Sequence, residues 1–158
     1  MLKKACLVIL NLGMCAAMWA SNASAAPYHS TFALRLIVDC SAPSSERMHR
    51  VESSEDLCVS RDVIVDGSNL ADVSVERDEY LDAYDIHIWL DNAGAKRMSS
   101  ATRKMKQNGR IGIVLDAQLI SAPFIMGHVS KEMLITAPEG GEKLKKIVKA
   151  IRSSMKSP

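Results

Sequence analysis

The central part of the chain changes from a two-residue to a three- to four-residue apolar period near Asp91. From Tyr84 to Leu90 every second residue is apolar, which predicts a strand with one face toward the core. Asp85, His87 and Trp89 fall on the other face of this strand. The change of period predicts that a helix follows the strand.

The predicted helix carries a start signal, a stop signal and an apolar stripe. Asp91 or Asn92 can cap its first turn, because their side chains accept hydrogen bonds from the unpaired N–H groups there. Asn108-Gly109 can end it, since glycine accepts the left-handed conformation. The stripe consists of Ala95, Met98, Ala101 or Thr102, and Met105. A strand with Ile111, Ile113 and Leu115 on one face follows, and then a turn into another strand.

Similar patterns predict the remaining elements. Strands are expected at 32–38, 57–65, 71–75, 124–129 and 133–135. The polar stretch 41–56 has no apolar period and predicts a loop or a short exposed helix, which is either a binding loop or a tolerated insertion. Thr136 to Glu139 has the pattern of a capping box for a last helix. The apolar face of that helix consists of Leu144, Ile147, Val148, Ile151 and Met155.

Lysines follow the opposite face of the last helix and form either a docking patch or a solvated surface. Taken together, the elements predict an α+β domain, a mainly antiparallel sheet with two helices packed on one face.

The N-terminal segment has the features of a signal peptide. Lys3-Lys4 precede an apolar run from Cys6 to Ala20, and Ala23-Ser24-Ala25 forms an A-x-A cleavage signal. We therefore expect residues 1–25 to be removed and residues 26–158 to form one exported domain; an uncleaved anchor is the alternative, for which the apolar run is short. No apolar run in 26–158 is long enough to span a membrane.

Removal of the leader also changes the charge. The formal net charge of +2 falls to near zero, because the leader carries two lysines and no acidic residue. A near-neutral domain has no strong field that would attract nucleic acid or an anionic membrane.

Two cysteines, Cys40 and Cys58, remain after the leader. An even pair in an oxidising compartment favours a disulfide, which would stabilise the fold by about 3 kcal/mol in the chain-entropy model. The alternative is a reactive thiol, but the chain has no C-x-x-C motif and no cationic signature beside either cysteine.

One stretch carries a family resemblance, at the motif positions Leu90-Asp91, Gly94-Ala95-Lys96, Thr102, Leu115-Asp116 and Ile120-Ser121-Ala122-Pro123. It resembles the head subdomain of the first periplasmic domain of SecD, a subunit of the bacterial preprotein translocase. Ala117 stands where that family usually has glycine, so the hairpin turn there is expected to differ. The resemblance extends over roughly Phe32 to Ile151. In the family, this subdomain is carried between proton-conducting helices, and without them the chain is not itself expected to drive translocation.

The pattern of reactive residues does not predict catalysis. The four histidines show no paired spacing for a metal, and no G-x-S-x-G, H-E-x-x-H or P-loop motif occurs. Asp116 and Ser121 are better explained as turn residues, and Asp91 as a helix cap. We therefore expect a protein that is not an enzyme and that has no cofactor and no metal.

A binding role fits the sequence better. The resemblance implies contact with exported polypeptides or with another protein of the cell envelope, in the bacterial periplasm or outside the cell. An exposed strand edge could pair with an extended polypeptide, and Trp89 and His87 form a possible binding surface. A small exported inhibitor or immunity-type protein that blocks one specific partner is the alternative. An enzyme, the third class, would require a deep pocket with perturbed titratable groups.

Overall fold

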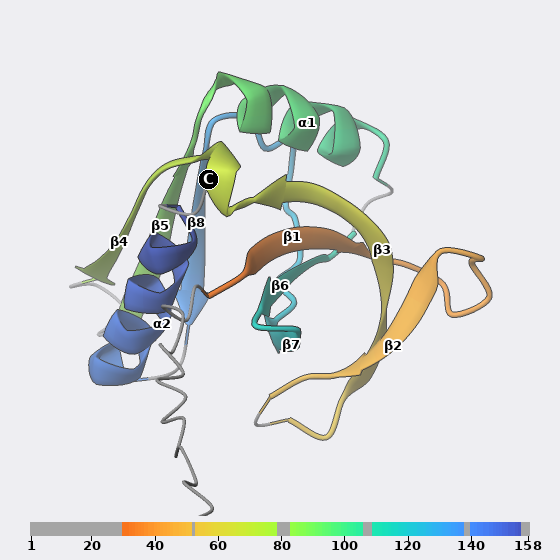
Figure 1. The fold of residues 1–158 in the computed structure, drawn as a ribbon, viewed down its shortest axis with the longest axis horizontal. Helices are drawn as coiled ribbons and strands as arrows, with labels where there is room; N and C mark the ends of the chain where they lie inside the picture. Colours follow the sequence, from red (N-terminus) through yellow and green to blue (C-terminus); the bar gives the residue numbers. More distant parts are fainter. Residues whose placement is uncertain (1–29, 52, 79–82, 106–108, 138–139, 156–158) are drawn as a thin grey trace, which may run out of the picture.

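The computed structural model describes residues 30–51, 53–78, 83–105, 109–137 and 140–155. Within these ranges, eight strands form two antiparallel sheets, and two α-helices pack against them (Figure 1). The expected leader, residues 1–25, lies outside the described residues.

The larger sheet has five strands in the order β2-β3-β1-β6-β7. The β3 strand is long and curved, so the sheet bends around a small second cluster of buried side chains (Figure 1). All five residues of β6 are buried, because one of its faces packs on the main core and the other on this cluster. The strands are β1 (Phe32–Ile37), β2 (Ser45–His49), β3 (Asp56–Asp66), β6 (Ile111–Leu115) and β7 (Gln118–Ser121).

The smaller sheet has three strands in the order β4-β5-β8. They are β4 (Leu70–Asp78), β5 (Ala83–Leu90) and β8 (Glu132–Ala137). A short 3-10 helix, η1 (Gly67–Asn69), joins the two sheets between β3 and β4. Because β5 is central, β4 and β8 are the two edges of this sheet.

The helices pack on different parts of this frame. Helix α1 (Asn92–Arg103) lies across β3 and the end of β5, while α2 (Gly141–Ser154) covers β4 and β5 (Figure 1). The main core lies between the two sheets and α2, and includes Leu34, Ile88, Ile113, Leu144 and Ile151. The predicted α+β class is confirmed, and the strands are divided between two sheets that the sequence did not separate.

Two of the predicted assignments are wrong, that of 41–56 as a loop or short helix and that of 124–129 as a strand. The stretch 41–56 is not a single loop or a short helix, because Ser45–His49 within it pairs with β3 as an edge strand. Met48 is the one large apolar residue of this strand, so its sequence has no apolar period. Residues 124–129 do not form a strand: Phe124 makes an isolated bridge to Arg110, and the chain then runs irregularly to β8.

Two helix boundaries also differ from the prediction. Helix α1 ends at Arg103 rather than at Asn108-Gly109. The capping box at Thr136–Glu139 is wrong in its first half, because Thr136 and Ala137 belong to β8; residues 138–139 lie outside the described residues. Helix α2 begins at Gly141 with Gly140 as its N-cap and without a side-chain cap.

Candidate functional site

The two edges of the three-stranded sheet differ. On β4, the N–H of Val73 donates to the Asp72 carboxylate (2.8 Å), and the C=O of Val73 accepts from the Nε of Arg152 (3.0 Å). Asp72 and Arg152 also form an ion pair with each other (3.6 Å). Both outward backbone groups of Val73 are therefore occupied by side chains, which closes this part of the edge to further strands.

The β8 edge is open. The N–H of Leu90 donates to the C=O of Lys131 (2.8 Å), so the backbone groups of Leu90 point toward β8. Two residues earlier, Ile88 points the same way and therefore forms a hydrogen-bonded pair with Met133. Hydrogen-bonded and non-bonded pairs alternate in an antiparallel sheet, so the backbone groups of Glu132 and Leu134 point away from β5. Among the described residues these groups have no backbone or side-chain partner. This edge can accept another strand.

An apolar groove of about 300 Å³ lies beside the open edge, between β8 and the 123–129 segment. Its lining includes Phe124 and Met126, which are 58% and 93% exposed, and Leu134 of β8, which is 57% exposed and whose side chain lies on the outer face of the sheet. These are three of the four exposed large apolar residues in the described part of the chain. An exposed apolar cluster of this kind marks an interaction surface. The floor consists of Leu34, Ile111 and Ile113.

The first end of the 123–129 segment is fixed to β6. Arg110 donates from Nε to the C=O of Ala122 (2.7 Å), and Ile111 donates its N–H to the C=O of Pro123 (3.2 Å). The Arg110 guanidinium also lies 5.0 Å from the centre of the Phe124 ring, within cation–π distance. Ala122 and Pro123 are positions of the predicted motif, and they hold one end of the groove wall.

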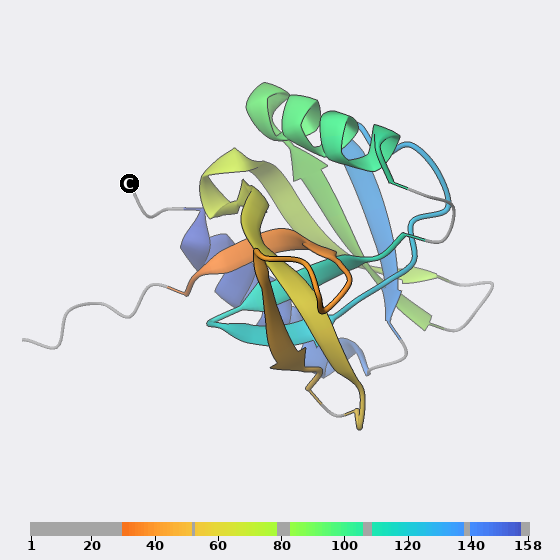
Figure 2. The same cartoon turned by 90° about the vertical axis from the view of Figure 1, so that its right-hand side faces the viewer.

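The second end of the segment is fixed to α1 through another motif position, Thr102. Its Oγ1 accepts from the N–H of Val129 (3.2 Å) and lies 3.3 Å from the Val129 carbonyl oxygen. The ring of His128 lies within 3.3 Å of the hydroxyls of Thr102 and Ser99. Figure 2 shows the segment passing along the end of α1 before it enters β8. The groove wall is therefore anchored at both ends.

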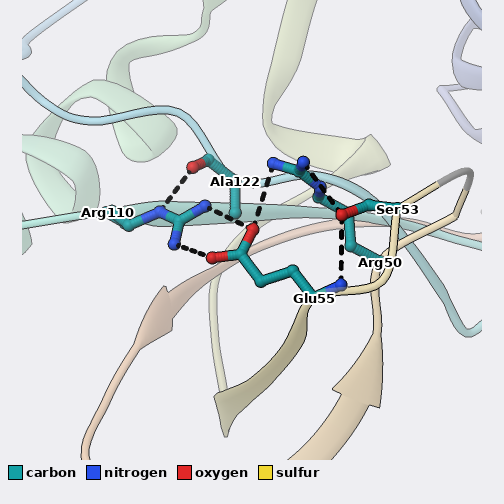
Figure 3. Close-up of polar contacts among 5 residues, drawn as sticks. All are labelled: Arg50, Ser53, Glu55, Arg110 and Ala122. Atoms are coloured by element: carbon teal, nitrogen blue, oxygen red, sulfur yellow. Dashed lines mark hydrogen bonds and ion pairs between the residues drawn. The ribbon is translucent and has the colours of Figure 1, made fainter.

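A charged network holds the Arg110 guanidinium in place (Figure 3). Its guanidinium makes two hydrogen bonds to the Glu55 carboxylate, of 2.7 and 3.3 Å, and Arg50 lies 3.2 Å from the same carboxylate. The hydrogen bond from Arg110 lowers the pKa of Glu55 from its ordinary value, and the nearby positive charges of Arg110 and Arg50 act in the same direction. Ser53 accepts from Arg50 (3.0 Å), so the β2–β3 turn is joined to the groove wall.

The predicted surface residues Trp89 and His87 lie outside the groove, on the outer face of the three-stranded sheet. Their rings stack with centroids 3.7 Å apart. One nitrogen of His87 contacts Glu132 on β8, and the other lies 3.3 Å from Glu76 on β4. This cluster crosses all three strands and ends at the open edge.

The other motif positions have structural contacts of their own. Asp91 caps α1 by accepting from the N–H of Gly94 (2.6 Å), and a Cβ on Gly94 would lie 2.8 Å from the C=O of Asn69. Leu90 is buried, Ala95 packs against the core, and Ser121 pairs with Ile113. Asp116 lies in the β6–β7 turn. The motif positions therefore do not form one cluster.

The predicted bond between Cys40 and Cys58 is confirmed, with the two Cα atoms 5.1 Å apart. It joins the segment after β1 to β3, on the side of the five-stranded sheet that carries β2.

The sequence reading missed the groove residues Phe124, Met126 and Leu134. Three consecutive apolar residues, Phe124 to Met126, followed by Gly127, were a usable signal, because neighbouring side chains of an extended segment point to opposite faces and cannot all enter one core. The open edge gave no such signal, since strand order depends on contacts between distant segments.

No group of three or more His, Cys, Asp or Glu side chains that could hold a metal ion occurs in the described ranges. Among the same residues, no helix is long and apolar enough to cross a membrane.

Three solved SecDF structures have a similar fold. One, described as a membrane component that enhances protein export, has a TM-score of 0.60 and 19% identity over 82% of this chain and 66% of its own. SecDF in a super-membrane-facing form has a TM-score of 0.61 and 20% identity. SecDF from Thermus thermophilus, a translocon-associated membrane protein, has a TM-score of 0.56 and 20% identity. For these last two structures, the matched region spans 82% of this chain and 20% of the SecDF chain.

No curated protein matches the sequence. The family model of the SecDF P1 head subdomain matches residues 44–155, which include the groove wall, β8 and the Arg110 network. The chain therefore belongs to the SecDF P1 head subdomain family.

Proposed function

We propose that the chain is exported to the periplasm, loses residues 1–25, and acts there as a non-catalytic module that binds extended segments of unfolded polypeptides. Membership of a family named for a protein-export factor supports the general role. The observation that carries the proposal is the open β8 edge beside an apolar groove.

The expected binding mode is strand addition. A peptide beside β8 can exchange backbone hydrogen bonds with Glu132 and Leu134 and insert alternate side chains into the groove. Each buried large apolar side chain contributes about 1.5–3 kcal/mol and each hydrogen bond about 1 kcal/mol. Against an association cost of at least about 4 kcal/mol, this predicts weak binding with a Kd of about 10–100 μM.

The test is fluorescence anisotropy of a labelled, valine-rich extended peptide with the 26–158 domain. Leu134→Ala removes an apolar contact, while Leu134→Pro also removes the outward N–H; proline is tolerated at an edge strand. We expect Leu134→Pro to weaken binding several-fold more than Leu134→Ala. Val63→Ser, at the exposed apolar residue outside the groove, is the matched control and should leave Kd unchanged.

Equal Kd values for Leu134→Pro and Leu134→Ala, with both proteins folded by circular dichroism, would exclude strand addition at β8. Pull-down from envelope extract separates this function from the inhibitor alternative. A polypeptide-binding module should retain many denatured proteins weakly, whereas retention of one folded protein alone would contradict the proposal. N-terminal sequencing of the periplasmic protein tests the cleavage before Ala26.

A further inference from the structure

The two faces of the three-stranded sheet differ at the open edge. Side chains of a β-strand point alternately to opposite faces of its sheet. In a strand added to β8, the residues on the inner face would enter the apolar groove, like Met133 and Ile135. The residues between them would lie on the outer face, beside Glu132 and Leu134. The composition of the outer face therefore decides which side chains are favoured at every second position.

The outer face is acidic. Glu132 and Glu76 are partly exposed carboxylates, and the side chain that pairs with both of them is His87. Asp85 lies opposite Glu76 on the same face; it is 4% exposed, and its Oδ1 has no hydrogen-bond partner. Two carboxylates thus contact one imidazole, and a third carboxylate lies opposite Glu76 on the same face, so acidic side chains outnumber basic ones in this cluster.

Arg152 does not neutralise this charge. Arg152 is already paired with Asp72 and bound to the edge of β4, on the far side of the sheet from β8. A buried carboxylate oxygen without a partner is costly, and a positive charge placed nearby reduces that cost. The open edge at β8 is where a foreign cation can approach.

We infer that the outer face selects positively charged side chains, so that the preferred ligand is an extended segment in which apolar residues alternate with lysine or arginine. This inference rests on the proposed function and names its ligand class. The aliphatic stem of a lysine or arginine can pack on Leu134, which is 57% exposed, while the charged head approaches Glu132. Trp89 adds an aromatic ring to the same face.

The test uses three labelled peptides of equal length, with valine at alternate positions and lysine, serine or glutamate at the others. At low salt we expect the Kd to increase in that order, with about a tenfold ratio between the glutamate and lysine peptides, because several partly exposed charges act together. Raising the salt concentration should reduce the ratio, since exposed charges are screened.

The double variant Glu76→Gln with Glu132→Gln keeps the side-chain shapes and removes two charges. We expect it to reduce the glutamate-to-lysine ratio of Kd values to about threefold or less. A general loss of structure would weaken both peptides alike and leave the ratio unchanged. Asp62→Asn removes one carboxylate from β3, in the other sheet, and should leave the ratio at its wild-type value.

The possible results separate this inference from the proposed function. Equal affinity for the three peptides, with binding that Leu134→Pro weakens, overturns the charge selection and leaves strand addition in place. Absence of binding to all three overturns both. A dimer in sedimentation that Leu134→Pro converts to a monomer would assign the β8 edge to a second copy of the chain and would also overturn the inference.

Discussion

Asp116 and Ala117 both have positive φ, of 52° and 61°, in the two-residue turn between β6 and β7. The turn is of the kind that favours Asn-Gly or Asp-Gly, because its twist matches that of the strands. Asp116 is held there by Thr31, whose N–H donates to the Asp116 carboxylate (2.8 Å) and whose C=O accepts from the Asp116 N–H (2.9 Å). Ala117, the motif position that departs from the family, has a side chain that disfavours the left-handed region.

We expect Ala117→Gly to raise the free energy of unfolding by about 0.5–1 kcal/mol, because glycine adopts positive φ without the Cβ penalty. Urea unfolding of the 26–158 domain measures it. Ala93→Gly, at an exposed position of α1, is the control and should lower stability by up to about 1 kcal/mol, since helical φ favours alanine. A loss of stability in Ala117→Gly would contradict the argument.

Glu55 predicts a pH effect of known sign. Its pKa is lowered in the folded protein by the Arg110 hydrogen bond, so this interaction stabilises the fold above the unfolded pKa of about 4.3. The contribution is lost as the pH falls through the folded-state pKa. Wild type should therefore be more stable than Glu55→Gln at pH 7, and the difference should shrink below about pH 4.

Urea titrations of both proteins between pH 3 and pH 7 check this. Hydrogen bonds from Ser41 and Lys145 also lower the pKa values of Asp39 and Glu142. Both carboxylates are present in wild type and in Glu55→Gln, so their contributions cancel when the two free energies of unfolding are subtracted. A difference that is constant across the range would show that the charge of Glu55 is not what stabilises the turn.

At the level of elements, the closed edge of β4 is the feature with the clearest consequence. Val73 has both of its outward backbone groups occupied by Asp72 and Arg152. The double variant Asp72→Ala with Arg152→Ala should expose them and promote association of copies through β4, because an uncovered strand edge pairs readily. Sedimentation velocity across a concentration series measures the association. Lys149→Ala, on the same face of α2, is the control and should leave the mass unchanged.

Elements with a strong apolar period could be predicted from the sequence. The β5 strand, α1 and α2 follow their patterns, and Met98, Leu144 and Ile151 are buried as expected. The β2 strand could not be predicted, because it depends on pairing with β3 and hardly on its own side chains. The 124–129 segment looked like a strand by composition, but its backbone bonds go to Gly109 and Thr102.

At the level of the whole molecule, the disulfide ties the segment after β1 to β3. Its cysteines are 18 residues apart, and closing a loop of this size contributes about 3 kcal/mol through the unfolded state. We expect Cys40→Ser with Cys58→Ser to lower the free energy of unfolding by about that amount. Reductant should have a similar effect on wild type and none on the double variant. An unchanged urea midpoint in the double variant would contradict a stabilising role.

The candidate site could be predicted only in part. The sequence raised a strand edge as the kind of surface that can bind polypeptides, and it placed Thr102, Ala122 and Pro123 among the motif positions. It could not identify the edge or the role of those three residues, because both follow from contacts between α1, β6 and β8. The exposed side chains of the groove likewise become visible only when the two sheets are brought together.

A three-stranded sheet with one open edge behaves differently from one with two. With Asp72 and Arg152 in place, the small sheet can be lengthened past β8 and not past Val73. One added strand then occupies the open β8 edge. If two copies of the chain pair through this edge, no open edge of the small sheet is left at β8 for a third copy. The arrangement that lets the small sheet accept a polypeptide strand at β8 thus limits its continuous extension into a fibre through β4.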